Sequence, residues 1–383
     1  MGTAKKVILL IETSRGYGRG LLTGIAEYCR LHGPWSFYRE PGGLDLTLPP
    51  RFNWDADGII MRDSAKARSL LSLGLPIIVV LHEYPPMKET TCILTDDTAI
   101  GKMAARHFLE KGFFNFAYCG IDRMHWSRNR CQSFQESIRQ AAFKVHVYKQ
   151  PRNKLGRSWK NEQIILANWL RDLPKPVGLL ACNDDRAQYI IEACKNADIR
   201  IPDQVAILGV DNDTLICNLA NPTFSSIALN TKRAGYEAAE ILDRRMNREE
   251  RKFEEAIIVH PTHIAARQST DFLAVADHEV ALAIRFIKDH ARKVIQVNDV
   301  VESSSLSRRV LEKRFRRVLN YSILDMIKTT HTEQVIKLLV ETNISVFQIA
   351  KTLGHPAFKH FARSFRQVTG MTPLAYRKKY GHK

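Results

Sequence analysis

The chain has 383 residues, 45% of them hydrophobic, which is long enough for two or three domains with buried cores. It carries 57 Lys and Arg against 40 Asp and Glu, a net charge of +17, and it has no apolar run of the length that a membrane span needs. The seven cysteines are scattered singly without a C-x-x-C pair and the chain opens without a signal-peptide pattern, so we expect a cytoplasmic protein with no disulfide framework, metal or cofactor.

Residues 1–270 alternate short apolar strands with amphipathic helices. Such alternation is typical of parallel sheets with right-handed crossovers, and its length predicts two doubly wound lobes. In these sheets a ligand lies beyond the carboxyl ends of the strands, so the segments that follow the strands are the places to look for a site. The predicted strands are 7–11, 58–61, 77–81, 116–119, 177–182 and 205–210, and the predicted helices include 21–31, 100–109, 164–170 and 189–197.

Polar side chains are concentrated in the loops predicted at 12–19, 122–130, 183–186 and 211–213. Carboxylates, amides and guanidinium groups form paired hydrogen bonds that suit adjacent sugar hydroxyls. A tryptophan can in addition cover the apolar face of a pyranose ring. The candidate ligand contacts are Arg15, Tyr17, Trp126, Arg130, Asn183, Asp184 and Asp211.

These candidates also have purely structural explanations. Asp211 and Asp184 are suited to capping a turn or a helix, Arg130 to a surface ion pair, and Trp126 to a core or an interface. The first loop could be a flexible segment at the edge of a lobe. Its glycines at 16, 18 and 20 suggest a nucleotide loop, but they lack the third glycine of the G-x-G-x-x-G spacing and the Lys-Ser/Thr of a P-loop.

The same segments resemble the effector domain of the LacI/GalR family, which shares its fold with periplasmic sugar-binding proteins. Residues 181–187 (A-C-N-D-x-x-A) and 207–212 (I-L-G-V-D-N) match the family's N-D-x-x-A and G-x-D segments. Residues 130–134 are similar to its R-x-x-G-F, with Ser133 in place of the usual Gly, and 222–227 resemble its P-x-L-T-T-I crossover. The resemblance implies that Arg130, Asn183 or Asp184, and Asp211 contact a small sugar.

The rest of the chain, residues 271–383, is predicted to be all-α, and residues 297–318 have the pattern of a helix-turn-helix motif. Apolar residues recur at helical spacing over 297–301, serines at 303–305 form the turn, and Val310 and Phe315 are predicted to face inward from the second helix. An arginine-rich outer face is what a helix needs to read a major groove. The predicted DNA-facing residues are Ser307, which also suits an N-cap, Arg308, Arg309, Glu312 and Arg316.

A second helix-turn-helix pattern occupies residues 345–377, with its turn at Gly354 and Pro356. Glycine permits the positive φ of a sharp turn, and proline presets φ for the start of the next helix. An apolar stripe from Phe358 to Phe365 is predicted to face inward. The predicted DNA-facing residues of this motif are Phe358, Lys359, His360 and Arg363.

Between the two motifs, residues 323–340 are predicted to form one long helix of about 27 Å. This length approaches one turn of DNA, about 34 Å, so both second helices can reach successive major grooves. Residues 272–383 also hold 20 Lys and Arg against 9 Asp and Glu, a concentration of positive charge that is typical of phosphate binding.

The tandem arrangement resembles the DNA-binding domain of the AraC/XylS family, through residues 306–315 (L-S-R-R-x-L-E-K-R-F) and 370–377 (G-x-T-P-x-x-Y-R). Asn320 departs from a frequent Gly of that family, and His355 departs from its usual Phe. A LacI-like sensor ahead of an AraC-type reader is similar, over essentially the whole chain, to a family of xylose-responsive activators. This resemblance implies D-xylose or a related sugar as effector and genes of xylose uptake and isomerisation as targets.

The sequence therefore predicts a periplasmic-binding-protein-like effector domain over 1–270 and a DNA-binding domain over 271–383. The expected partners are a sugar, a double-stranded DNA operator, a second copy of the chain and, for an activator, RNA polymerase, with no membrane. Alternatives are another pentose or a purine as effector, action as a repressor, a sugar-modifying enzyme, which would need a convergent acid/base pair or metal cluster, and a binding protein with no DNA role.

Overall fold

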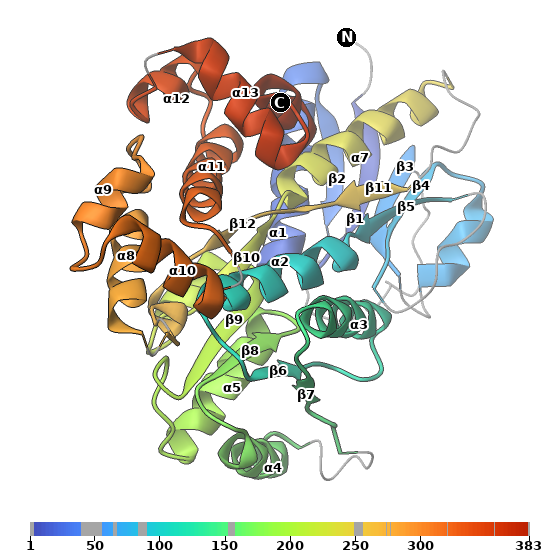
Figure 1. Cartoon of the computed structure of the whole chain (residues 1–383). Helices are drawn as coiled ribbons and strands as arrows, with labels where there is room; N and C mark the ends of the chain where they lie inside the picture. Colours follow the sequence, from blue (N-terminus) through green and yellow to red (C-terminus); the bar gives the residue numbers. More distant parts are fainter. Residues whose placement is uncertain are drawn as a thin grey trace.

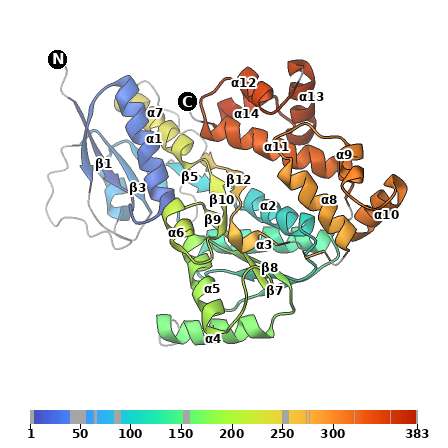
Figure 2. The same cartoon turned by 90° about the vertical axis from the view of Figure 1, so that its left-hand side faces the viewer.

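The computed structural model describes residues 4–39, 56–63, 67–82, 90–151, 158–248, 256–272, 274–275, 277–319, 321–355 and 357–381. Asn320 and Pro356, which the sequence analysis singled out, lie outside these ranges. The described chain forms two α/β lobes with a group of helices packed beside them (Figures 1 and 2). None of the described helices combines the length and the apolar character that a membrane span requires.

Lobe 1 contains a six-stranded parallel sheet in the order β11-β5-β4-β3-β1-β2. Helices α1 (Gly16–His32) and α7 (Thr231–Met246) pack against each other beside this sheet, and a 3-10 helix, η1, spans Ala67–Leu73. The strands are β1 (Lys5–Leu10), β2 (Trp35–Arg39), β3 (Gly58–Arg62), β4 (Ile77–Val80), β5 (Thr91–Thr95) and β11 (Ile257–Val259).

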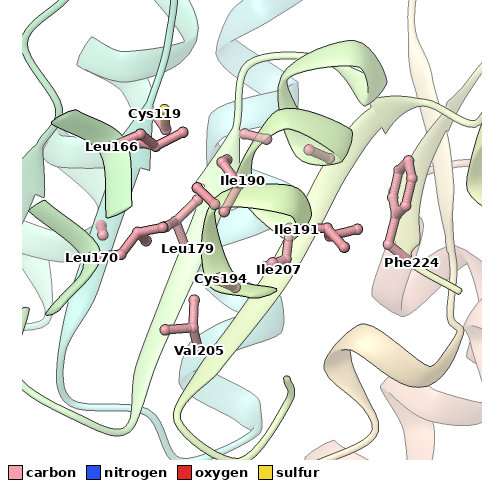
Figure 3. Packing of buried hydrophobic residues seen from close by; sticks show 14 of the residues in the cluster. Cys119, Leu166, Leu170, Leu179, Ile190, Ile191, Cys194, Val205, Ile207 and Phe224 are labelled. Atoms are coloured by element: carbon pink, nitrogen blue, oxygen red, sulfur yellow. The ribbon is translucent and has the colours of Figure 1, made fainter. Parts of the chain in front are cut away.

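Lobe 2 repeats this topology in the order β12-β10-β9-β8-β6-β7, and its sheet is parallel except for β12, which is antiparallel to β10. Its core fills the space between the sheet and its helices, and Figure 3 shows Leu179 and Ile207 of the sheet beside Leu166 and Ile190 of the helices. The strands are β6 (Phe116–Cys119), β7 (Val145–Val147), β8 (Val177–Ala181), β9 (Val205–Asp211), β10 (Ser225–Leu229) and β12 (Pro261–Ala265). The helices are α2 (Asp97–Glu110), α3 (His125–Gln140), α4 (Trp159–Asp172), α5 (Asp184–Asn196), α6 (Thr214–Leu219) and the 3-10 helix η2 (Gln268–Thr270).

The prediction of two doubly wound lobes is confirmed, but three of the predicted loops are wrong, since 183–186 also lies largely in a helix, α5, which begins at Asp184. Helix α1 begins at Gly16 and α3 begins at His125, so Tyr17, Trp126 and Arg130 lie on helices rather than in loops. Close packing requires the glycines of α1, because a Cβ at Gly18 would lie 2.0 Å from the Glu12 carbonyl oxygen. Gly18 therefore lets the helix approach the end of β1, and Gly20 lets it approach Thr231 of α7, which accounts for the spacing that suggested a nucleotide loop.

Three chain crossovers join the lobes, and a histidine in one crossover is hydrogen-bonded to a residue in each of the other two. Asp96 follows β5, Asn230 follows β10 and His260 separates β11 from β12. The backbone amide of His260 donates to the Asn230 side-chain oxygen at 2.6 Å, and the Asp96 carboxylate lies 3.1 Å from His260 Nδ1. We call these three residues the hinge.

The C-terminal helices form two small cores that share one long helix, α11 (Ile323–Glu341). Ile323 and Met326, in its first half, pack with Leu311 and Phe315, while its second half packs against the following helices. The predicted pair of helix-turn-helix motifs and the long helix between them are confirmed. The remaining helices are α8 (His278–Asp289), α9 (Val297–Glu302), α10 (Arg308–Leu319), α12 (Val346–Thr352), α13 (Phe358–Thr369) and α14 (Pro373–Tyr380).

The predicted inward orientation is wrong for two residues of the second helices. Val310 is 39% exposed and Phe358 is 43% exposed. In each helix the buried contacts come from residues four apart, Leu311 with Phe315 and Phe361 with Phe365, so one large side chain per turn fills the core. The apolar stripe of each second helix is therefore narrower than the sequence pattern indicated.

Candidate functional sites

A cavity of about 450 Å³ lies between the two lobes, at the carboxyl ends of their strands. In lobe 1 the strand order reverses between β1 and β3, and in lobe 2 it reverses between β6 and β8. Ligands bind at such switch points because the connections leave the sheet on opposite faces there. Cavity residues follow all four of these strands, for example Glu12 after β1, Trp126 after β6 and Asn183 after β8. The volume suits one small molecule.

Six of the seven predicted ligand contacts line this cavity. Asp184 does not, because its carboxylate lies buried behind the cavity wall, where it accepts hydrogen bonds from Ser226 Oγ at 2.6 Å and from the Asp213 amide at 2.7 Å. Burial raises the pKa of Asp184 well above its usual value. The predicted residues that line the cavity are Arg15, Tyr17, Trp126, Arg130, Asn183 and Asp211.

The three arginines that line the cavity, Arg15, Arg62 and Arg130, are each paired with a carboxylate. Arg62 Nη1 lies 2.6 Å from Glu12 Oε2, and Arg130 Nε lies 2.9 Å from Asp97 Oδ1. Arg130 is 4% exposed and also donates from Nη1 to the Cys182 carbonyl oxygen at 2.5 Å, which holds its guanidinium at the end of β8. Cations and carboxylates thus balance each other, so the cavity is suited to a neutral, hydroxyl-rich ligand more than to an ion.

The indole of Trp126 lines the cavity beside Arg130 and His82. Its ring lies 4.7 Å from the guanidinium carbon of Arg130 and 5.5 Å from the ring of His82. Its indole Nε1 is buried and meets no hydrogen-bond acceptor among the described residues. Burial and the neighbouring arginines lower the pKa of His82 to about 3, so this imidazole is neutral. A buried donor without a protein acceptor is favourable only where a ligand or water accepts its hydrogen bond.

Asp211 ends β9 with an unusual backbone conformation. Its φ is +107° and that of Asn212 is +47°, both in the region that L side chains rarely adopt. Arg267 stabilises this turn by donating from Nη2 to Asn212 Oδ1 at 2.9 Å. Burial raises the pKa of Asp211 to about 7, against the opposing charge of Arg130. Strained backbone of this kind is concentrated at functional sites.

The start of α1 bridges the two lobes. Arg15 Nε lies 2.6 Å from Asp185 Oδ2, and Arg19 Nη2 lies 2.6 Å from Asp213 Oδ1. The amide of Gly16 also donates to Asp213 Oδ2 at 2.8 Å. We call these contacts the latch, because they hold lobe 1 against lobe 2. The buried Asp184 positions the Asp213 backbone for this role.

Several cavity residues were missed by the sequence analysis. Arg62 and His82 directly follow predicted strands, so the strand-end rule that selected Asp211 would also have selected them. Asp97 had no such signal, because β5 was not predicted, whereas Asn129 lies in the predicted polar loop 122–130 and was not selected from it. The other polar residues that line the cavity and were missed are Glu12, Thr95, Asp96 and His125.

The two helix-turn-helix motifs present basic surfaces to solvent. Ser307 directly precedes α10, and its carbonyl oxygen accepts from the Leu311 amide at 3.0 Å, as at an N-cap position. Arg308 Nε donates to Glu312 Oε1 at 3.0 Å on the exposed face of that helix. All the other predicted DNA-facing residues are exposed too, namely Arg309, Arg316, Phe358, Lys359, His360 and Arg363.

His355, which stands where the related family usually has Phe, packs under the second motif. Its Nε2 lies 2.7 Å from Nε2 of His331 in α11, and its ring contacts that of Phe361 in α13 at 4.9 Å between centroids. The other nitrogen of His331 lies 2.9 Å from the Ala291 carbonyl oxygen. Burial and the neighbouring His331 lower the pKa of His355 to about 4. Gly354, beside it, has the predicted positive φ, +78°.

The helical part contacts the lobes at two places next to the hinge. His260 of the hinge lies edge-on to Tyr380 of α14, with 5.3 Å between ring centroids. Three residues later, His263 Nε2 lies 3.0 Å from Glu341 Oε1 at the end of α11. Because Asp96 both lines the cavity and contacts His260, the cavity and the last helix are connected through one histidine.

Comparison with known proteins gives a consistent result. Residues 105–270 match the periplasmic binding protein-like domain family, and residues 300–379 match a helix-turn-helix domain family. The xylose operon regulatory protein of Haemophilus influenzae is 30% identical over 97% of this chain and 98% of its own length, and that of Escherichia coli K12 is 29% identical over 97% and 96%. A solved structure of a xylose-binding transcription activator aligns over 99% of both chains at 29% identity with a TM-score of 0.62. A LacI family regulator from Enterococcus faecium with bound ribose aligns over 70% of this chain and 98% of its own at 20% identity, TM-score 0.56, which shows a shared fold.

Proposed function

The chain belongs to the family of xylose operon regulatory proteins, and from this premise we propose that it is a D-xylose-dependent activator of genes for xylose uptake and metabolism. That it is a sugar-responsive, DNA-binding transcription regulator follows from its relatives and its helix-turn-helix domain. The identity of the sugar and the sign of regulation belong to the proposal. We further propose that the effector domain spans residues 1–270 and the DNA-binding domain 271–383.

The observation that carries the proposal is the chemistry of the interlobe cavity. Paired Arg and carboxylate groups, the strained Asp211 and the indole of Trp126 all line a space that fits one small molecule. Vicinal hydroxyls can replace water at these groups, and an indole can cover the apolar face of a sugar ring. We propose Arg15, Tyr17, Trp126, Arg130, Asn183 and Asp211 as direct contacts, with Asp184 supporting them from behind the wall.

The proposed mechanism is a shift between open and closed lobes. A sugar that contacts both lobes favours the closed arrangement, which the latch also stabilises. Closure changes the angle at the hinge, and His260 transmits the change to α14 of the DNA-binding domain. In a homodimer this would alter the separation of two readers, each with a groove-facing α10 and α13, and thereby their fit to operator half-sites and to RNA polymerase.

Two alternatives from the sequence analysis carry less weight. A sugar-modifying enzyme finds no support, because the relatives are transcription regulators with helix-turn-helix domains. A purine effector would favour a cavity with more aromatic stacking surface. Among the described lining residues, the aromatic side chains are Tyr17, Trp126 and two histidines, and the arginine–carboxylate pairs lie beside them.

Isothermal titration of the full chain with D-xylose, other pentoses, hexoses and purines tests the proposal. We expect D-xylose to bind most tightly and Asp211→Ala to weaken binding by about tenfold to a hundredfold, as for the loss of a charge-assisted hydrogen bond. Tighter binding of another sugar would overturn the effector assignment and leave the regulator assignment intact.

A further inference from the structure

The two helix-turn-helix motifs begin in the same way, which allows their side chains to be compared position by position. The first helix of each motif opens with a capping box, formed by Gln296 with Asp299 in α9 and by Ser345 with Gln348 in α12. The second residue after the N-cap is Asn298 in α9 and Phe347 in α12, so these two residues occupy equivalent positions.

The first residue of each second helix gives another equivalent pair, Arg308 in α10 and Phe358 in α13. In the first motif the two positions are joined by a hydrogen bond from Arg308 Nη1 to Asn298 Oδ1 at 3.2 Å. In the second motif the same two positions are aromatic, and the rings of Phe347 and Phe358 lie 6.2 Å apart between centroids. One motif therefore presents a polar pair where the other presents an apolar pair.

The aromatic pair lies on the surface. Phe347 is 65% exposed and Phe358 is 43% exposed. Lys359 and Arg363, on the same recognition helix, are exposed beside them. Two exposed rings cost favourable burial unless a partner covers them, and the neighbouring cations suit a partner that is negatively charged around an apolar group.

DNA has this chemistry in its major groove. The 5-methyl group of thymine is the apolar feature of the groove and is flanked by phosphates. In helix-turn-helix proteins the first residues of the second helix meet base edges. We propose that Phe358 contacts a thymine methyl group with Phe347 packed beside it, whereas Arg308, held by Asn298, contacts a polar base edge at the other half of the site. This rests on the proposed role of α10 and α13 as the groove-facing helices.

Uracil substitution tests the inference, because deoxyuridine keeps the base pair and lacks only the methyl group. A binding duplex is first selected from a random pool with the full-length protein. It is then resynthesised with deoxyuridine in place of each thymidine in turn. We expect one or two positions to weaken binding about threefold to fivefold, the effect of one lost methyl contact. The double variant Phe347→Ala and Phe358→Ala should bind the selected duplex and its deoxyuridine-substituted forms equally.

Two controls separate this contact from other effects. Arg308→Ala should weaken binding and retain the response to deoxyuridine, because it acts in the other motif. Leu374→Ala removes a side chain of α14 that is 69% exposed and should change neither property. Unchanged melting temperatures would show that both phenylalanine substitutions leave the fold intact.

The outcomes decide the inference. Binding that no deoxyuridine weakens, or that is weakened equally in wild type and double variant, would overturn the methyl contact while DNA binding stands. Failure to select any duplex would overturn the proposed function and this inference together. A double variant with normal binding and normal deoxyuridine response that fails only in transcription would assign the pair to a protein partner instead.

Discussion

At the scale of single residues, the cavity depends on charges that the fold keeps buried. Asp211 is the clearest case, since burial raises its pKa to about 7 although Arg130 opposes the shift. The hydroxyl groups of a sugar donate to a carboxylate more strongly than to a carboxylic acid. Binding should therefore lower the pKa of Asp211 and release its proton.

The first prediction follows from that sign. Sugar affinity should rise as the pH increases through about 7 and reach a plateau above it, because only ionised Asp211 accepts these hydrogen bonds. Titration calorimetry between pH 5.5 and 8.5 measures this. Asp211→Asn should bind more weakly at pH 8 and show little dependence on pH. An affinity of the wild type that stays constant over the range would contradict the assignment of Asp211.

The second prediction concerns His355 in the DNA-binding domain. Its pKa of about 4 lies below the value of about 6.5 for an unfolded chain, so protonation favours unfolding. The stability that neutral His355 contributes is fully present above about pH 6.5 and is lost as the pH falls toward 4. Between pH 7 and 4.5, the melting temperature of His355→Phe should fall by less than that of the wild type. His278→Ala, an exposed histidine of α8, should leave that loss unchanged.

At the scale of elements, hydrophobic periodicity predicted the long helix correctly, whereas polar composition alone placed several helix starts in loops. Residues 323–340 were recognised as one helix because apolar residues recur over its whole length, and α11 spans Ile323–Glu341. Helix α1 starts earlier than the predicted helix 21–31, and α3 begins inside a predicted loop, because their first turns are polar and line the cavity, so those turns carry no apolar signal. Asp97 was missed for a related reason, since it opens α2 ahead of the predicted helix 100–109 and follows a strand, β5, that was not predicted.

Long-range pairing was beyond reach of the sequence. Nothing in the pattern indicates that Arg19 would meet Asp213, which is 194 residues away, or that Asp96 would meet His260. Such contacts follow from the orientation of the lobes, which depends on the whole chain. The strand-end rule predicted where the cavity lies. It also predicted six of the polar residues that follow the predicted strands and line the cavity, namely Arg15, Tyr17, Trp126, Arg130, Asn183 and Asp211. The latch and the hinge were found only in the structure.

The third prediction tests the latch. Arg19→Ala removes the ion pair with Asp213 and should favour open lobes, which weakens sugar binding about twofold to tenfold, within the range of partly exposed ion pairs. Arg30→Ala, an exposed residue in the last turn of α1, is the matched control and should have no effect. Calorimetry measures both. An unchanged affinity in Arg19→Ala would mean that the latch contributes nothing to closure.

At the scale of the whole molecule, the helical part contacts lobe elements close to the hinge. Helix α11 packs on β12, the strand that follows His260. A DNA-binding domain attached near the axis of lobe movement is displaced less than one attached at a lobe edge, but its orientation changes. Orientation is what a reader with two recognition helices is sensitive to, because both must fit successive grooves.

The fourth prediction separates sensing from response. Tyr380 contacts His260 and lies outside the described lining of the sugar cavity, so Tyr380→Ala should leave D-xylose affinity within twofold of wild type. The same variant should reduce the factor by which the sugar changes DNA affinity, measured by fluorescence anisotropy with and without D-xylose. Coupling between sites commonly amounts to about fivefold or more, so a fall toward onefold is measurable. Tyr380→Phe keeps the ring that faces His260 and should retain the response. If Tyr380→Ala responds to the sugar as wild type does, the signal must cross elsewhere, and the contact of His263 with Glu341 becomes the next one to remove.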